Sequence, residues 1–117
     1  MAKNQVFAPS KTRSLPVPDG TVSGDPVIVG TIVGVALTDK GDGGNDAANA
    51  TVAIDGAWDL AIGTATALAV GDKVFIVTST RALTTTDNTG ANPVFGKILE
   101  AKGTTAGEVH PVEIVQV

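Results

Sequence analysis

The sequence contains no cysteine and no tyrosine, and its 117 residues include one tryptophan, three phenylalanines and one histidine. Without cysteine, a disulfide framework and a thiolate metal site are both excluded. With aromatic residues at only 3%, the ring faces on which sugars and unpaired bases stack are scarce. The composition therefore argues against disulfide-stabilised, zinc-thiolate and carbohydrate-binding proteins.

Long apolar runs are also missing. No run approaches the ~20 residues that cross a bilayer, and the opening residues 1–4 lead into no hydrophobic segment. We therefore expect a soluble protein with neither a membrane helix nor a signal peptide. The length suits one domain that buries roughly two-thirds of its unfolded surface.

Charge is divided unevenly along the chain. Lys3, Lys11 and Arg13 all precede the first acid, Asp19, so the first 18 residues carry +3. Because the whole chain carries −4, the remainder carries −7. This division predicts a basic arm on an acidic body, drawn by charge to an acidic protein surface. Three cations are too few to predict nucleic-acid binding, whose affinity grows with the number of phosphates neutralised.

Valine, threonine, alanine and glycine dominate the remaining sequence. β-branched side chains fit a pleated surface, and glycine and proline supply turns. These features predict an all-β fold, a small β-barrel or β-sandwich of short antiparallel strands over residues 22–117. An extended N-terminal arm is expected over residues 1–21.

The arm is predicted from its prolines, because Pro9, Pro16 and Pro18 each lack a backbone donor. Two short apolar segments, residues 6–8 and 15–17, are suited to pair as added strands with a sheet edge on another chain. A disordered tail, or a first strand of the same domain, is an equally open interpretation.

The stretch Val22–Leu37 returns later in altered form. Its Gly-Asp turn and following β-branched run recur at residues 71–77, and its last five residues, VGVAL, are matched by FGKIL at residues 95–99. Glycine tolerates positive φ, and an aspartate carboxylate accepts hydrogen bonds from nearby backbone amides. The recurrence predicts a repeated hairpin unit.

Other local signals predict individual strands and turns. The apolar run 26–37 predicts a strand or strand pair with a bend at Gly30. Asp55-Gly56 stands between two strand-like runs, which predicts a hairpin. Residues 63–68 are the one place where a helical turn is expected, and the chain should close with a strand over residues 109–117.

Candidate chemistry is sparse. The loop residues Asp39, Asp42, Asn45 and Asp46 offer oxygen ligands for calcium, but their spacing fits no calcium-loop pattern, so a solvated loop is the favoured interpretation. His110 lies at the start of a strand without a serine or cysteine nucleophile pattern, which predicts a surface or edge histidine. We expect no catalytic residues, no metal and no cofactor.

The order of these motifs resembles the capsid decoration, or cement, proteins of tailed bacteriophages, a group sometimes labelled recombinase-like. The resemblance covers nearly the whole chain and is carried by the following segments: MAKN at residues 1–4, SGDPV at 23–27, VGVALT at 33–38, DGAWDL at 55–60, VGDKV at 70–74 and FGKILEA at 95–101. No phosphate-binding loop of the kind a recombinase needs is present.

The resemblance implies a structural protein, not an enzyme, that is made in the host cytoplasm and binds the outer surface of the virion capsid as a homotrimer. Its partners would be the major capsid protein and copies of itself, with neither nucleic acid nor membrane. The arm would contact the capsid through Lys3, Val6, Phe7, Lys11, Arg13, Leu15 and Val17. The subunit interface would use Trp58, Val115 and Val117. A host-binding or carbohydrate-binding β module remains the alternative.

Overall fold

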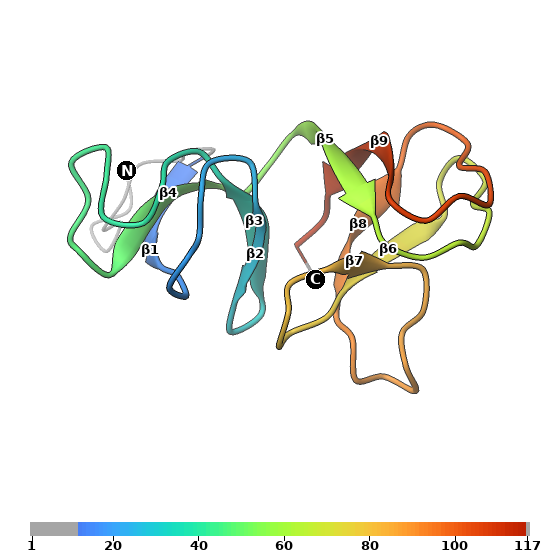
Figure 1. Cartoon of the computed structure of the whole chain (residues 1–117), viewed down its shortest axis with the longest axis horizontal. Coiled ribbons are helices and arrows are strands. Elements are labelled where there is room, and N and C mark those ends of the chain that lie inside the picture. The colour runs from blue at the N-terminus through green and yellow to red at the C-terminus, as the bar shows by residue number, and fades with distance from the viewer. Residues whose placement is uncertain (1–11, 117) are drawn as a thin grey trace, which may run out of the picture.

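The computed structural model describes residues 12–116, and its strands form two bodies that lie side by side (Figure 1). Four strands form a sheet in the order β1-β4-β3-β2, and five strands close into a barrel in the order β5-β7-β6-β8-β9. The described residues contain no helix, which confirms the predicted all-β class. The strands are β1 (Thr12–Pro16), β2 (Pro26–Val29), β3 (Ile32–Ala36), β4 (Asn49–Ala53), β5 (Ala57–Ile62), β6 (Lys73–Ile76), β7 (Leu83–Thr84), β8 (Val94–Ile98) and β9 (Glu108–Ile114).

The two bodies share one pairing scheme. We call residues 12–54 the first half and residues 56–116 the second half. In the first half β1 pairs with β4, β4 with β3 and β3 with β2; in the second half β5 pairs with β9, β9 with β8 and β8 with β6. Val27 lies opposite Gly34 as Val74 lies opposite Gly96. The repeat predicted from the sequence is therefore present in the register of the strands and extends over four strands of each half.

The repeated Gly-Asp turns have matching geometry. Gly24 and Gly71 adopt φ values of 94° and 91°, which side chains with a Cβ rarely adopt. In each turn the aspartate carboxylate accepts a hydrogen bond from the backbone N–H three residues earlier, at 3.0 Å for Asp25 and 2.9 Å for Asp72. Each turn therefore directs the chain into the following strand by the same local contacts.

The halves differ where β2 and β6 end. Only Gly30 and Thr31 separate β2 from β3, whereas residues 77–93 separate β6 from β8 and contain β7. β7 pairs antiparallel with β6 and parallel with β5, so the second half closes into a barrel. The first half remains an open sheet with β1 and β2 at its edges.

Each half has its own apolar core. The first cluster contains Val17, Val27, Ala36, Ala50 and Val52. The second lies inside the barrel and also takes in two buried residues of β3. Small side chains line the first half where the barrel has large ones, since Ala36 occupies the position of Ile98. The open half therefore fills a smaller interior.

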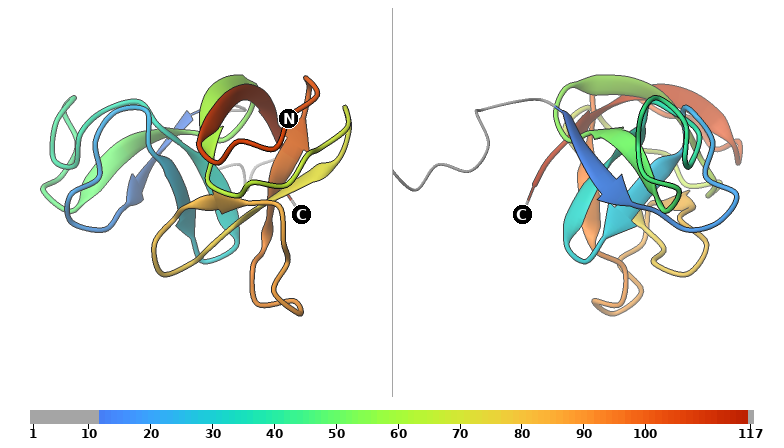
Figure 2. Two further views of the ribbon diagram at one scale, coloured as in Figure 1. Left: turned by 45° about the vertical axis from the view of Figure 1, so that its right-hand side comes forward. Right: turned by 90° about the vertical axis from the view of Figure 1, so that its left-hand side faces the viewer.

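A glutamine from the end of the chain joins the halves. Gln116 Nε2 donates to the carbonyls of Val33 at 2.6 Å and Ile54 at 3.0 Å, while Oε1 accepts from Val33 N at 3.2 Å. Val33 and Val35 of β3 pack into the barrel's apolar cluster. The two bodies are thus held together by both apolar and polar contacts. They lie side by side in the left view of Figure 2, whereas in the right view the first half lies in front of the second.

Two local predictions are wrong. Asp55-Gly56 does not close a hairpin, because β4 pairs with β1 and β3 whereas β5 pairs with β9 and β7. The turn instead links the halves, and Gly56 adopts a φ of 94° there. Residues 63–68 form no helical turn, and Leu68 forms an isolated bridge with Lys102. The predicted bend at Gly30 is confirmed as a two-residue hairpin turn.

β1 lies within the stretch predicted as an arm. It pairs along its whole length with β4, which matches the alternative that this stretch contributes a first strand. For residues 1–11, which lie outside the described part of the chain, the arm stays a prediction.

We expect Gly34→Ala and Gly96→Ala to destabilise the protein for a steric reason. A Cβ at Gly34 would lie 2.3 Å from the Ala53 carbonyl oxygen, and one at Gly96 would lie 2.0 Å from that of Glu113. Forcing such strands apart should lower the free energy of unfolding by about 3 kcal/mol, measured by urea denaturation. Gly71→Ala, which meets open space, should cost only about 1–2 kcal/mol through its positive φ; equal losses in all three variants would contradict this account.

We expect Gln116→Ala to lower the free energy of unfolding by about 1–3 kcal/mol, because it leaves partly buried backbone groups without partners. Gln116→Glu keeps the acceptor for Val33 N but loses both donated hydrogen bonds and brings a negative charge to two carbonyl oxygens. It should therefore cost at least as much as the alanine variant. A glutamate variant as stable as the wild type, measured by thermal and urea unfolding, would show that the joint does not depend on this amide.

Candidate interaction surface

The structure places three of the predicted capsid-contact residues in or beside β1. Leu15 packs against the apolar core of the first half, and Val17, which follows β1, is buried. Arg13 Nη1 donates to the carbonyl of Thr12 at 2.9 Å. The remaining four, Lys3, Val6, Phe7 and Lys11, lie outside the described residues. The capsid role of all seven stays a prediction.

The residues predicted at a subunit interface lie in the second half. Trp58 is half-buried against the barrel core, and its Nε1 donates to the carbonyl of Asp55 at 3.0 Å. Val115 is half-buried and its N–H donates to the carbonyl of Phe95 at 3.1 Å. Val117 lies outside the described residues. Trp58 lies near the start of β5 and Val115 follows the end of β9, and these two strand ends pair with each other. The interface role of both residues stays a prediction.

The loop considered for calcium is organised by an asparagine. Asn45 Nδ2 donates to the carbonyl of Asp42 at 2.7 Å and to Thr51 Oγ1 at 3.0 Å, and Oδ1 accepts from Ser14 Oγ at 2.6 Å. Asp39 accepts a hydrogen bond from the backbone N–H of Ser23. Between residues 12 and 116, no three acidic or histidine side chains gather closely enough to hold a metal ion. The loop's polar groups therefore hold it against β1 and β4.

Exposed apolar side chains lie near the Gly-Asp turn of each half. Leu37 follows β3 as Leu99 follows β8, and both side chains are exposed. An exposed valine also lies near each turn, but at different positions, because Val22 is two residues before Gly24 and Val70 is one residue before Gly71. The backbone contacts match, because Leu37 N donates to the carbonyl of Thr51 at 2.8 Å and Leu99 N to that of Pro111 at 2.9 Å. In the second half the exposed Val109 of β9 adds to this surface. Each half thus presents an apolar contact point at the same position.

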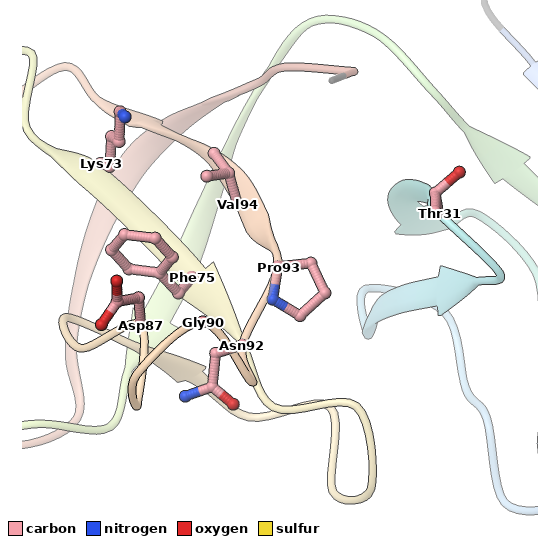
Figure 3. Close-up of a pocket in the computed structure, with 8 residues that line it drawn as sticks. All are labelled: Thr31, Lys73, Phe75, Asp87, Gly90, Asn92, Pro93 and Val94. Atoms are coloured by element: carbon pink, nitrogen blue, oxygen red, sulfur yellow. The ribbon is translucent and has the colours of Figure 1, made fainter.

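A groove of about 450 Å³ lies beside the β2–β3 turn of the first half and β6 and β8 of the second. In Figure 3 the Phe75 ring lies between Lys73 and Asp87, and Thr31 stands apart on the turn. Asn92 at its rim donates its amide to the carbonyl of Thr86 at 3.0 Å. The polar groups of the groove do not converge on one point, which distinguishes it from a typical small-molecule site.

A buried lysine ties together loops at one end of the barrel. The Lys102 side chain is fully buried, and its Nζ donates to the carbonyls of Thr66, Gly103 and Thr105 at 2.9–3.2 Å. Glu108 Oε2 lies 3.9 Å from the same nitrogen. A buried ammonium is costly unless polar groups surround it. These contacts therefore fix the connection between β8 and β9 against the connection between β5 and β6.

His110 is buried, so the prediction of a surface or edge histidine is wrong. Its Nε2 lies 3.0 Å from Glu108 Oε1 and its Nδ1 lies 3.1 Å from Glu100 Oε1. The hydrogen bond to Glu108 raises the pKa of His110 above its ordinary value, against the opposing effect of burial, and Glu100 adds to the rise. In turn, His110 and the backbone N–H of Thr105 lower the pKa of Glu108.

Sequence reasoning missed the lysine and the paired carboxylates because they are separated in the chain and share no motif. The one available signal was the alternation of β9, in which His110 shares the inward side with Val112 and Ile114.

No membrane-spanning helix occurs among residues 12–116.

We expect the stability of the protein to depend on pH through this cluster. Because the folded protein raises the pKa of His110, its contribution is fully present below about pH 6.5 and is lost as pH rises through the folded value. Because the folded protein lowers the pKa of Glu108, its contribution is present above about pH 4.5 and is lost as pH falls through the folded value. The pair should therefore stabilise most between these limits.

His110→Gln should abolish the fall in unfolding free energy above pH 6.5, measured by urea denaturation across a pH series. The sequence has no other histidine, so no second imidazole obscures the result. An unchanged fall in the variant would show that His110 is not its source.

Comparison with known proteins identifies a family for this chain. The family model of the phage cement proteins matches residues 8–113. Neither the curated proteins nor the solved structures contain a match to the chain. Cement proteins are structural components of the phage capsid, which indicates a capsid decoration role. The chain therefore belongs to the phage cement protein family.

Proposed function

We propose that this chain decorates the outer surface of a tailed-phage head, where it binds the major capsid protein as a homotrimer and stabilises the lattice. The observation that carries the proposal is the family match over residues 8–113. The geometry supports it, because the described residues present exposed apolar contact points rather than a pocket with convergent polar groups. The chain acts by adhesion and needs no chemical step.

The repeated contact points suit a partner that is itself repeated. Leu37 and Leu99 lie at equivalent positions in halves held together by Gln116, and each half has an exposed valine, Val22 or Val70, near its Gly-Asp turn. Two weak contacts at a fixed separation bind a lattice more tightly than either alone, because the second contact is made at a high effective concentration. Trimerisation multiplies the contacts again.

The basic side chains near the N-terminus supply a second, electrostatic contribution. Lys3, Lys11 and Arg13 precede every acidic residue of the chain, and they are the proposed contacts for acidic groups on the capsid. Such attraction is screened by salt. Val6 and Phe7 are proposed to add a strand to a neighbouring chain of the decorated lattice.

The proposal is tested by mixing the purified chain with expanded capsids that lack it. We expect saturable co-sedimentation, weakening with ionic strength, and a rise in the temperature at which the shell dissociates. Leu99→Asp should lower the affinity about tenfold or more, whereas Ala101→Asp, a matched charge at a small exposed neighbour, should change it less. The proposal fails if the wild-type chain does not sediment with capsids or leaves their dissociation temperature unchanged.

A further inference from the structure

The first half lacks the strand that closes the second half. In the barrel, Leu83 of β7 lies opposite Ile76 of β6 on one side and Ile62 of β5 on the other. The N–H of Gly63 donates to the Leu83 carbonyl at 2.9 Å. In the first half, the equivalent strands β2 and β1 are the two edges of the sheet. No strand of residues 12–116 takes the place of β7 there.

The edge of β2 presents backbone groups for pairing. Ala36 N donates to the Asp25 carbonyl at 2.9 Å. Hydrogen-bonded and non-hydrogen-bonded residue pairs alternate along an antiparallel ladder from that point, so Ile28 and Val33 form a non-hydrogen-bonded pair. The N–H and C=O of Ile28 therefore point away from β3, and within residues 12–116 they have no hydrogen-bond partner. The equivalent residue of the barrel, Phe75, lies opposite Thr84 of β7.

Pro26 limits the length of this edge. Proline lacks a backbone donor, so pairing at the start of β2 is blocked and is confined to Ile28 and its C-terminal neighbours. The strand that fits is therefore short, as is β7 with its two residues. An occupant of this place needs only a few residues in extended conformation and one apolar side chain, as Leu83 provides in the barrel.

We propose that residues 6–8 from the N-terminal segment of a second copy of this chain occupy the place of β7 in the first half. The eleven residues before β1 span up to roughly 36 Å when extended, and they carry the apolar segment Val6-Phe7-Ala8. Three consecutive residues of this kind match the length of the available edge. The inference rests on the proposed homotrimer and names the contact that builds it.

Strand direction assigns the segment to a second copy. β7 runs parallel to β5, so the matching occupant runs parallel to β1 and leaves near residue 17. To reach its own Thr12, it would have to return along β1, a distance of roughly 17 Å. Only residues 9–11 lie between residue 8 and Thr12, and the four chain steps from residue 8 to Thr12 span at most about 14 Å. A copy's own segment therefore cannot take this place in the β7 direction.

Disulfide trapping tests the assignment directly, because the chain has no cysteine of its own. Ala8→Cys and Val29→Cys are prepared separately, mixed and oxidised, both free in solution and bound to capsids. We expect a disulfide-linked dimer of the two variants in at least one of these conditions. Thr104→Cys, on an exposed loop of the barrel, replaces Val29→Cys as the control and should give no dimer with Ala8→Cys.

Three outcomes overturn the proposal. The first is no dimer above the control in either condition. The second is an intrachain disulfide in a chain carrying both Ala8→Cys and Val29→Cys, which would show that the segment closes its own first half. The third is trapping of Ala8→Cys on the capsid protein alone.

A second measurement separates this inference from the proposed function. Phe7→Asp should weaken self-association at least tenfold by light scattering, with an unchanged circular dichroism spectrum, whereas Asn4→Asp, an equal charge change outside the apolar segment, should not. If Phe7→Asp leaves the oligomer intact but abolishes capsid binding, the proposed pairing of residues 6–8 with a second copy is wrong and the decoration function stands. If the oligomer of the variant dissociates as expected but the wild-type chain fails to bind capsids, the decoration function is wrong and the proposed pairing between copies stands.

Discussion

The contact of Gln116 with Val33 and Ile54 holds the two halves in one arrangement. β3 pairs with β4 only over its last two residues, so the N–H and C=O of Val33 would otherwise lack partners. The Gln116 side-chain amide supplies both a donor and an acceptor to that residue, as a neighbouring strand would. Buried peptide groups are costly when unpaired, so the C-terminal segment completes the sheet and fixes the barrel against it.

The two halves share one arrangement of paired strands but enclose side chains of different size. The barrel contains large side chains and the inserted β7, whereas the first half has Ala36 and Ala50 where the barrel has Ile98 and His110. Smaller side chains let an open sheet cover its own core, as the burial of that core shows. As a result β2 remains an unpaired sheet edge within residues 12–116, and Pro26 shortens the part of it that can accept another strand. In the proposed self-association, such an edge lets a strand from a neighbouring molecule add backbone hydrogen bonds without a large interface.

Features of the fold that depend on neighbouring residues could be predicted from the sequence, whereas features that depend on pairing between distant segments could not. The Gly-Asp turns, the bend at Gly30 and the all-β class follow from residues adjacent in sequence, so the sequence predicts them correctly. Asp55-Gly56 was misassigned because its turn geometry is local, whereas the partners of β4 and β5 lie far away in the chain. The burial of Lys102 and His110 depends on carbonyls and carboxylates brought together from separate loops. The exposed Leu37 and Leu99 are conspicuous only once both halves are compared.

The arrangement explains how a chain with few aromatic residues and no disulfide serves a structural role in a virion. Its halves are held at a fixed separation and each presents a small apolar surface; in the proposed function, the repeated capsid lattice would multiply these weak contacts. Electron microscopy of purified particles tests this account most directly. It predicts density for this two-part chain on the outer face of the shell, in contact with more than one capsid subunit; a shell without that density, or the chain located inside it, would contradict the account.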